Sequence, residues 1–261
     1  MKDITRLLCM VLLSFLVVTG CSRRDILDDY PVSGVEVRLD WSGVTEKLPE
    51  GVRIIFYPKD EKGRKIDTYL SVTGGEVKVP SGHYAVVIYN YDTETVLIRG
   101  EESYETIQAY TNFCKLGIAG TEKMVWGPDP LYVVNIDDLD IQNSEETLIL
   151  KLKPKLVIRT YSFSIKVQGL SNVSNVIGSI GGMADHYFLG KAYAMCDDYP
   201  INIDLNVKAG KIEGVFTTFG LPEAIITRLE IKLPVMMNLM IIKVDNSVQE
   251  VKINITEAVQ E

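Results

Sequence analysis

Val35-Glu36-Val37-Arg38-Leu39-Asp40 alternates one apolar with one charged side chain over six positions. In a β-strand, successive side chains point to opposite faces, so the three apolar residues share one face and the three charged residues share the other. The stretch therefore predicts a strand with one face against a core and one face in water.

Strand-like runs of this kind, alternating or rich in β-branched residues, recur along the chain. We expect strands at residues 52–57, 76–79, 84–89, 131–136, 147–152, 156–167, 201–207, 228–233, 239–244 and 248–255. Turn residues separate them, as at 58–63, 73–75, 80–82, 209–210 and 245–246. Short strands divided by turns predict antiparallel sandwiches or barrels and argue against a parallel α/β sheet. We interpret the best helix candidates, residues 136–141 and 221–226, as turns or connectors.

The run at 84–89 differs from the others because both sets of alternating residues, and so both faces of the expected strand, are apolar. Tyr84, Val86 and Ile88 alternate with Ala85, Val87 and Tyr89. Such a strand is expected to be covered on both faces. Pro80-Ser81-Gly82 comes before it and predicts a turn in which Gly82 supplies backbone freedom.

The N-terminal sequence is typical of a secretory signal peptide. Lys2 and Arg6 are followed by an apolar run over 7–18, and its length of about twelve residues is short of the roughly 20 that a membrane-spanning helix needs. Val18-Thr19-Gly20-Cys21 then resembles the lipobox of bacterial lipoproteins. The resemblance implies cleavage between Gly20 and Cys21 and a lipid on the Cys21 thiol, and so a membrane contact through that lipid. The alternative is an ordinary signal peptide without a lipid.

The remaining length fits two domains. We expect a signal peptide over 1–20, a tether over 21–32, and β-sandwich domains over 33–154 and 155–261, since domains of about 100 to 150 residues are common. Pro154 marks the junction because proline cannot donate a hydrogen bond to a strand ladder.

Composition excludes several classes of function. The 261 residues carry 35 acidic and 27 basic side chains, a net charge of −8, which disfavours nucleic acid as a partner. Only two histidines occur, which leaves little material for a zinc site or a histidine-based catalytic centre. No common nucleotide-binding or hydrolase motif is present. We therefore expect neither an enzyme nor a bound cofactor or metal.

The possible reactive groups have simpler interpretations. We expect Asp185 and His186 to point to opposite faces of a strand and not to cooperate, and His83 to be a surface residue. The acidic cluster Asp137, Asp138 and Asp140 is interpreted as a solvated turn, with a calcium site as the alternative. Cys114 and Cys196 are the thiols left after processing, and we expect them unpaired, with a disulfide as the alternative.

Several short patterns occur in a recognisable order. They are Phe56-Tyr57-Pro58, Pro80-Ser81-Gly82-His83-Tyr84, Tyr89-Asn90-Tyr91-Asp92, Gly127-Pro128-Asp129-Pro130-Leu131-Tyr132, Gly181-Gly182-Met183-Ala184 and Phe216-Thr217-Thr218-Phe219-Gly220. With the lipobox, this order resembles an uncharacterised Bacteroidetes lipoprotein family of the fimbrillin-like superfamily, similar to fimbrial anchoring subunits. The resemblance implies an all-β fold of two tandem transthyretin-like β-sandwich domains, on a lipid anchor and without catalytic residues.

The resemblance also implies a role in the cell envelope. It points to an outer membrane lipoprotein that serves fimbriae or surface adhesion and binds a pilin-like subunit. Surface lipoproteins of Bacteroidetes often carry acidic residues directly after the lipidated cysteine, whereas here Arg23 and Arg24 come first. The body of the protein therefore faces either the outside or the periplasm.

Two features leave the partner open. Fimbrillin-like proteins donate a strand to a neighbouring subunit, and the run at 248–255 is either such a donor or the last strand of the second domain. An alternative function is glycan binding by tyrosines in or beside loops, because exposed aromatic rings stack on sugars. The tyrosines in question are Tyr89, Tyr91, Tyr104, Tyr110, Tyr187, Tyr193 and Tyr199.

Overall fold

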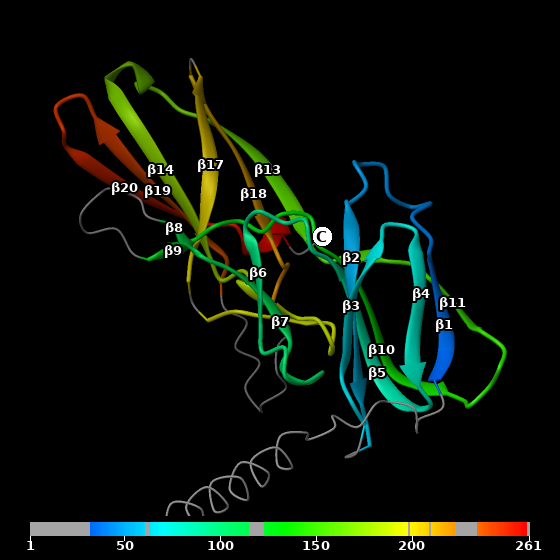
Figure 1. Cartoon of the computed structure of the whole chain (residues 1–261). Helices are drawn as coiled ribbons and strands as arrows, with labels where there is room; N and C mark the ends of the chain where they lie inside the picture. The colour runs from blue at the N-terminus through cyan, green and yellow to red at the C-terminus, as the bar shows by residue number, and fades with distance from the viewer. Residues whose placement is uncertain are drawn as a thin grey trace, which may run out of the picture.

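A computed structural model describes residues 32–60, 63–114, 123–197, 199–208, 210–222 and 234–259. Within these ranges the chain is built from strands, and its only helical turns are the short 3₁₀ segments Leu170–Asn172 and Thr256–Val259. Figure 1 shows the strands as curled sheets in two lobes, with a smaller sheet beside them. The expected all-β fold of tandem β-sandwich units is confirmed. The predicted signal peptide, Gly20 and Cys21 lie outside the described residues.

The first lobe is one eight-stranded sheet in the order β11-β1-β4-β3-β2-β5-β10-β12. Its strands are β1 (Val32–Leu39), β2 (Gly51–Pro58), β3 (Ile66–Ser71), β4 (Gly74–Pro80), β5 (Gly82–Asn90), β10 (Tyr132–Ile141), β11 (Leu148–Leu152) and β12 (Lys155–Leu156). Strand β1 contains the stretch that opened the sequence, and Val35, Val37 and Leu39 are buried there as predicted. It pairs with β4 in antiparallel and with β11 in parallel orientation.

Strands β2 and β5 are buried on both faces, which confirms the prediction for residues 84–89. On one face, Ile54 and Val86 pack into a core with residues of β1 and β4. On the other face, Ile55 and Val87 pack into a second core that includes Ala184 and residues near it. Gly82 has a φ of 150°, which agrees with the turn expected there. The centre of the first sheet therefore carries two cores at once.

The second lobe has the strand order β13-β18-β17-β14-β19-β20. Its strands are β13 (Arg159–Lys166), β14 (Val173–Gly181), β17 (Ile201–Lys208), β18 (Lys211–Thr218), β19 (Met236–Lys243) and β20 (Val248–Asn254). Strand β17 pairs with β14 near its start and with β18 over the rest of its length. The core between these strands is apolar, with Ile180, Ile201 and Met237 nearly inaccessible to solvent.

A third, four-stranded sheet joins the two lobes, and we call it the seam sheet. Its order is β16-β15-β7-β6, from β6 (Val96–Arg99), β7 (Gln108–Thr111), β15 (His186–Phe188) and β16 (Tyr193–Met195). Strands β7 and β15 pair directly, with Tyr110 opposite His186. The short strands β8 (Phe113–Cys114) and β9 (Met124–Val125) add a second link, since Val125 pairs with Ile201 of β17.

The chain passes from the first lobe to the second between β12 and β13, close to Pro154. Strand pairs nevertheless join residues from before and after this point in the seam sheet. The division into residues 33–154 and 155–261 therefore stays a prediction about folding units.

One sequence interpretation is wrong and another is only partly covered. Residues 136–141 form no turn or helix but continue β10, where the register with β5 shifts between Ile136 and Leu139. This bulge accommodates two acidic residues in a strand that otherwise pairs regularly. Of residues 221–226 only Leu221 and Pro222 are described, outside any strand, and the predicted strand at 228–233 lies outside the described residues.

Candidate functional site

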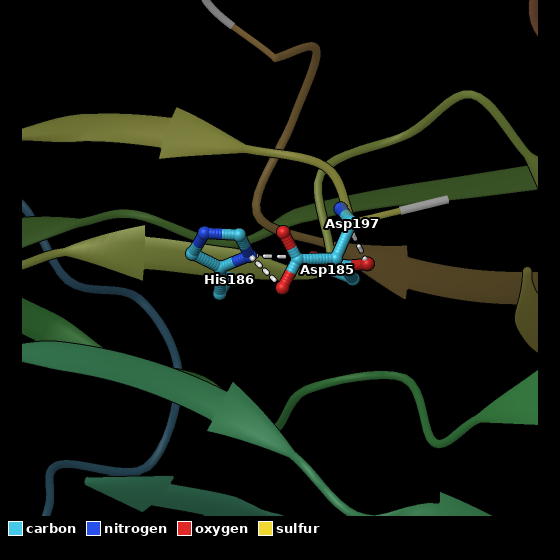
Figure 2. Close-up of side chains that lie close together, drawn as sticks. All are labelled: Asp185, His186 and Asp197. Carbon is cyan, nitrogen blue, oxygen red and sulfur yellow. Dashed lines mark hydrogen bonds and ion pairs between the residues drawn. The ribbon is translucent and has the colours of Figure 1, made fainter. Parts of the chain in front are cut away.

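Three titratable side chains meet at one end of the seam sheet (Figure 2). His186 Nδ1 lies 2.6 Å from Asp185 Oδ1 and 3.9 Å from Asp197 Oδ2. The backbone N–H of Asp197 donates to Asp185 Oδ2 at 2.9 Å. Within the part of the chain that the structure describes, these residues are the one group of three histidine, cysteine or acidic side chains whose ligand atoms all lie within 4.8 Å of one another.

This cluster corrects the expectation that Asp185 and His186 cannot cooperate. Asp185 lies in a bend directly before β15 and not within the strand. The alternation of side chains holds only inside a strand, so Asp185 is free to turn its carboxylate onto the neighbouring ring. Asp185 and His186 are 7% and 5% exposed, whereas the Asp197 side chain is 53% exposed. The group is therefore buried on one side and open to solvent at Asp197.

A positive charge lies next to this group. Arg99 of β6 places Nη2 3.9 Å from Asp197 Oδ2, and its guanidinium lies 4.7 Å from the centre of the Tyr110 ring. The group thus combines residues of β6 with residues around the β15–β16 hairpin. An imidazole and two carboxylates are ligand types that divalent cations use, although a hydrogen bond between His186 and Asp185 also accounts for their contact.

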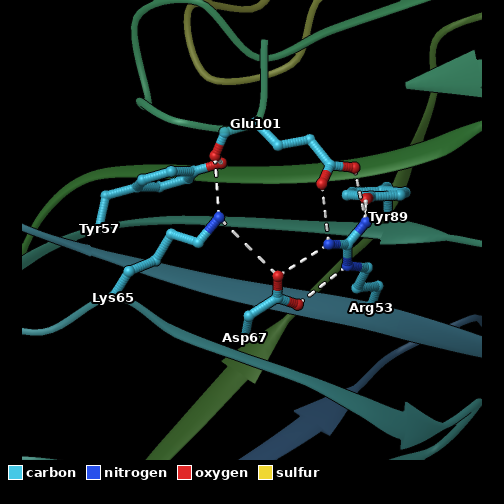
Figure 3. Close-up of polar contacts among 6 residues, drawn as sticks. All are labelled: Arg53, Tyr57, Lys65, Asp67, Tyr89 and Glu101. Carbon is cyan, nitrogen blue, oxygen red and sulfur yellow. Dashed lines mark hydrogen bonds and ion pairs between the residues drawn. The ribbon is translucent and has the colours of Figure 1, made fainter. Parts of the chain in front are cut away.

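A second polar cluster ties the first sheet to the hairpin between β6 and β7 (Figure 3). Arg53 of β2 donates Nε and Nη2 to Asp67 of β3 at 2.9 and 2.7 Å. It also donates Nη1 and Nη2 to Glu101 at 2.7 and 3.0 Å, and Nη1 to the Tyr89 hydroxyl at 2.8 Å. Tyr57 and Lys65 donate to the backbone carbonyl of Glu101.

The charges in this cluster shift the titration of its members. Hydrogen bonds from Arg53 hold the pKa of Asp67 below its usual value. The two carboxylates in turn raise the pKa of Arg53, while burial raises the pKa of the Tyr57 and Tyr89 hydroxyls. Each guanidinium nitrogen has an acceptor, so the cluster is a closed structural network.

A cleft of about 630 Å³ lies between the first sheet and the loops at Tyr104 and Lys191. Tyr104 donates its hydroxyl to Asp137 at 2.9 Å, and burial is the main cause that raises the Tyr104 pKa. Lys191 Nζ lies 5.2 Å from the centre of the Tyr104 ring, and Lys65 Nζ lies 5.7 Å from that of Tyr57. Because Tyr57 and Tyr104 are almost fully buried, the cleft offers no open aromatic face for a sugar.

The tyrosines proposed for glycan binding lie in loops or near the ends of strands. Four of them are in strands: Tyr89, Tyr110, Tyr187 and Tyr193. Tyr91 is 45% exposed and packs edge to face on Tyr69, and Tyr199 is 38% exposed and packs in the same way on Phe113. The expectation that the tyrosines lie in or beside loops therefore holds for the four in strands as well, since each is at a strand end or one residue from it.

The acidic residues of β10 contact different partners. Asp137 accepts from Tyr104, while Asp138 pairs with Lys59 at 3.0 Å and lies 3.5 Å from the exposed His83. Because these residues belong to a bulged strand, the predicted turn is wrong, although Asp137, Asp138 and Asp140 are exposed and His83 is at the surface as expected. No disulfide joins Cys114 to Cys196 in the described structure.

The outer strands of the two large sheets are candidate interaction edges. The run at 248–255 forms β20, which pairs with β19 at seven positions and ends the second sheet. It is thus the last strand of its own sheet, and on its outer side no further strand pairs among the described residues. Strand β11 holds the equivalent place in the first sheet. The described residues contain no helix long and apolar enough to cross a membrane.

The comparisons with known proteins agree on one family. Residues 20–204 match the model of a domain of unknown function, DUF5119. The chain is 53% identical to the "Putative fimbrium anchoring subunit Fim4B" of Bacteroides ovatus, and the match covers 96% of this chain and 78% of that protein. It superposes with a TM-score of 0.83 on the crystal structure of a putative adhesin from Bacteroides ovatus, at 52% identity and over 92% of this chain and 88% of the other.

A more distant structure shares the fold alone. The fimbrial anchor protein Mfa2 from Porphyromonas gingivalis superposes with a TM-score of 0.54 at 14% identity, over 87% of this chain and 83% of that one. Together with the all-β architecture, these matches establish that the chain belongs to the DUF5119 family.

Proposed function

We propose that this protein is a lipid-anchored, non-enzymatic subunit that fixes a fimbrium to the outer membrane. The observation that carries the proposal is the 53% identity, over 96% of the chain, to a protein named as a fimbrium anchoring subunit. The described fold supports a structural role. Within each polar cluster the charged side chains mainly pair with one another, and these contacts tie sheets together.

The membrane contact is assigned to Cys21. Cleavage after Gly20 leaves Cys21 as the first residue, and its thiol carries the acyl chains. The tether predicted over 21–32 overlaps the first strand by one residue, since β1 begins at Val32. One acyl chain alone gives only marginal binding, whereas several chains give a durable anchor.

The partner is a pilin-like subunit that pairs with a sheet edge. Edge strands present free N–H and C=O groups that a strand of another chain can complete. The outer edges at β20 and β11 are the candidates, and exposed Glu250 and Ile149 mark them.

The membrane anchor is tested by Cys21→Ala. In bacteria that process lipoproteins, the unchanged chain should fractionate with membranes and the variant should be released. If the variant stays with the membranes, the lipid anchor is refuted.

Site-specific crosslinking tests the partner. A photo-reactive amino acid is placed at Glu250 or Ile149, with exposed Glu46 in a loop as the matched control. After illumination of intact cells that make fimbriae, an adduct with a fimbrial subunit should form from an edge position and not from Glu46. Absence of such an adduct at both edges, together with retention of the protein on a polysaccharide gel, would favour the glycan alternative.

A further inference from the structure

We propose that Asp185, His186 and Asp197 form a binding site for one divalent transition-metal ion of the Zn²⁺ type. The inference does not depend on a role in fimbriae. It rests on three chemically suitable ligands that the start of β15 and the segment after β16 bring to one point (Figure 2).

The spacing of the ligand atoms suits such an ion. Zinc bonds to imidazole nitrogen and carboxylate oxygen are about 2.0–2.2 Å long, so tetrahedral ligands lie roughly 3.4 Å apart. Here His186 Nδ1 lies 2.6 Å from Asp185 Oδ1 and 3.9 Å from Asp197 Oδ2. One separation is shorter and the other longer than this value, and all three ligand atoms lie within 4.8 Å of one another, so the side chains must shift to bind an ion.

The surroundings orient the ligands in advance. The Asp197 backbone N–H donates to Asp185 Oδ2 and leaves Oδ1 directed at the imidazole. Partners that fix the orientation of a ligand are typical of metal sites. Asp185 and His186 are more than nine-tenths buried, while the exposed Asp197 carboxylate provides an entry path from solvent.

The charges are also compatible with a dication. Two carboxylates balance the two positive charges, and the imidazole would bind in its neutral form through Nδ1 with the ring proton on Nε2. Arg99 is the opposing charge, with Nη2 3.9 Å from Asp197 Oδ2. It competes with the ion for this carboxylate and therefore lowers the affinity of the site.

Bound metal would act on the seam sheet. The ligands flank the β15–β16 hairpin, and β15 pairs with β7 of the first half of the chain. A metal that joins the two ends of this hairpin would hold it closed. Because the ion binds the folded form, it should raise the unfolding temperature of the protein.

Titration calorimetry with Zn²⁺ on the full chain, kept reduced in detergent, tests the proposal. The unchanged protein should bind one equivalent with a saturable isotherm. His186→Asn and Asp197→Asn should each weaken binding at least tenfold. His83→Asn, which removes the other histidine of the chain, should leave binding unchanged.

Two further variants test the groups that lie beside the three ligands. Arg99→Gln should strengthen Zn²⁺ binding several-fold, because a competing cation is removed. Cys196→Ser should retain binding, since the proposed ligands contain no thiol. If His186→Asn fails to fold, Asp197→Asn still tests the site. Asp197 is largely exposed, and the variant keeps the backbone hydrogen bond to Asp185.

Each outcome supports the metal site or overturns it. A rise in unfolding temperature on addition of Zn²⁺ that disappears in Asp197→Asn supports the site. No saturable binding by the unchanged protein, equal binding by Asp197→Asn, or loss of binding in His83→Asn or Cys196→Ser overturns it.

Discussion

Arg53 and Glu101 are joined by two parallel hydrogen bonds, from Nη1 to Oε1 at 2.7 Å and from Nη2 to Oε2 at 3.0 Å. Arg53 belongs to β2 of the first sheet, whereas Glu101 follows β6 of the seam sheet. The pair therefore fixes the position of one sheet against the other. Only 17% of the Arg53 side chain is exposed, so the contact is largely shielded from water.

Arg53→Gln should destabilise the protein by about 2 kcal/mol. Breaking a fully buried ion pair costs about 3–5 kcal/mol, and the partial exposure of Asp67 and Glu101 reduces that figure. Arg38→Gln is the matched control, because Arg38 pairs with Glu36 at 2.8 Å on the surface and its loss should cost much less than that of Arg53. Urea unfolding measures both, and equal losses would contradict the role of Arg53.

Asp67 should make the protein sensitive to acid. Its pKa is depressed in the folded state by hydrogen bonds from Arg53, so the contribution of Asp67 to stability is present above the unfolded pKa of about 3.9. That contribution is lost as the pH falls below about 4 and through the folded pKa. Asp67→Asn should therefore be less stable at pH 7 and show a shallower decline of stability below about pH 4, as followed by urea unfolding across pH. An unchanged slope would refute this source of acid sensitivity.

Ile54 and Ile55 are neighbours in β2 that belong to different cores, and both are fully buried. Each change to alanine should therefore cost about 2–5 kcal/mol, through lost burial and the cavity left behind. In a strand with one exposed face, the alanine substitution of only one of two neighbouring residues would destabilise the protein this much. Val215→Ala on β18 is the control, because Val215 is 46% exposed and its loss should stay within about 0.5 kcal/mol. Calorimetry of the three variants would refute the two-core arrangement if Ile54→Ala or Ile55→Ala behaved like the control.

The sequence predicts most of the long strands, where burial leaves a readable pattern, but it misses β14 (Val173–Gly181) and β18 (Lys211–Thr218). Alternation at residues 35–40 predicts β1. Apolar side chains on both faces over 84–89 predict that β5 is buried on both faces. The seam sheet is not predicted, because β6, β7, β15 and β16 have only three or four residues each. So short a strand carries too few side chains to show a period.

The polar clusters are hidden from the sequence for a related reason. Arg53, Asp67 and Glu101 are far apart in the chain and meet only because β2 pairs with β3 and the β6–β7 hairpin folds back. Asp185 and His186 are adjacent, but the assumption that both lie in a strand put them on opposite faces. A glycine pair at Gly181-Gly182, with φ of 79° at Gly182, is the local signal that the strand ends before Asp185.

Gly190→Ala should loosen the contact between the two halves of the chain. A Cβ at Gly190 would lie 2.1 Å from the carbonyl oxygen of Tyr104, which is backbone and cannot rotate away. Relieving such a clash typically costs about 1–3 kcal/mol. The neighbouring hydrogen bond from Leu189 N to the carbonyl oxygen of Ile107 should weaken as the two segments move apart.

Gly181→Ala is the matched control for this change. A Cβ at Gly181 has its nearest neighbour at 3.9 Å, which is ordinary contact, so the variant should be neutral or slightly more stable. Hydrogen exchange at the amides of Leu189 and Ala109 reads out the seam directly, whereas the amides of β1 and β4 report on the first lobe. Faster exchange confined to the seam in Gly190→Ala supports the view that this close backbone approach holds the halves together. Equally faster exchange at all of these amides, or no change in exchange at any of them, would show that the seam sheet does not open separately from the rest of the protein.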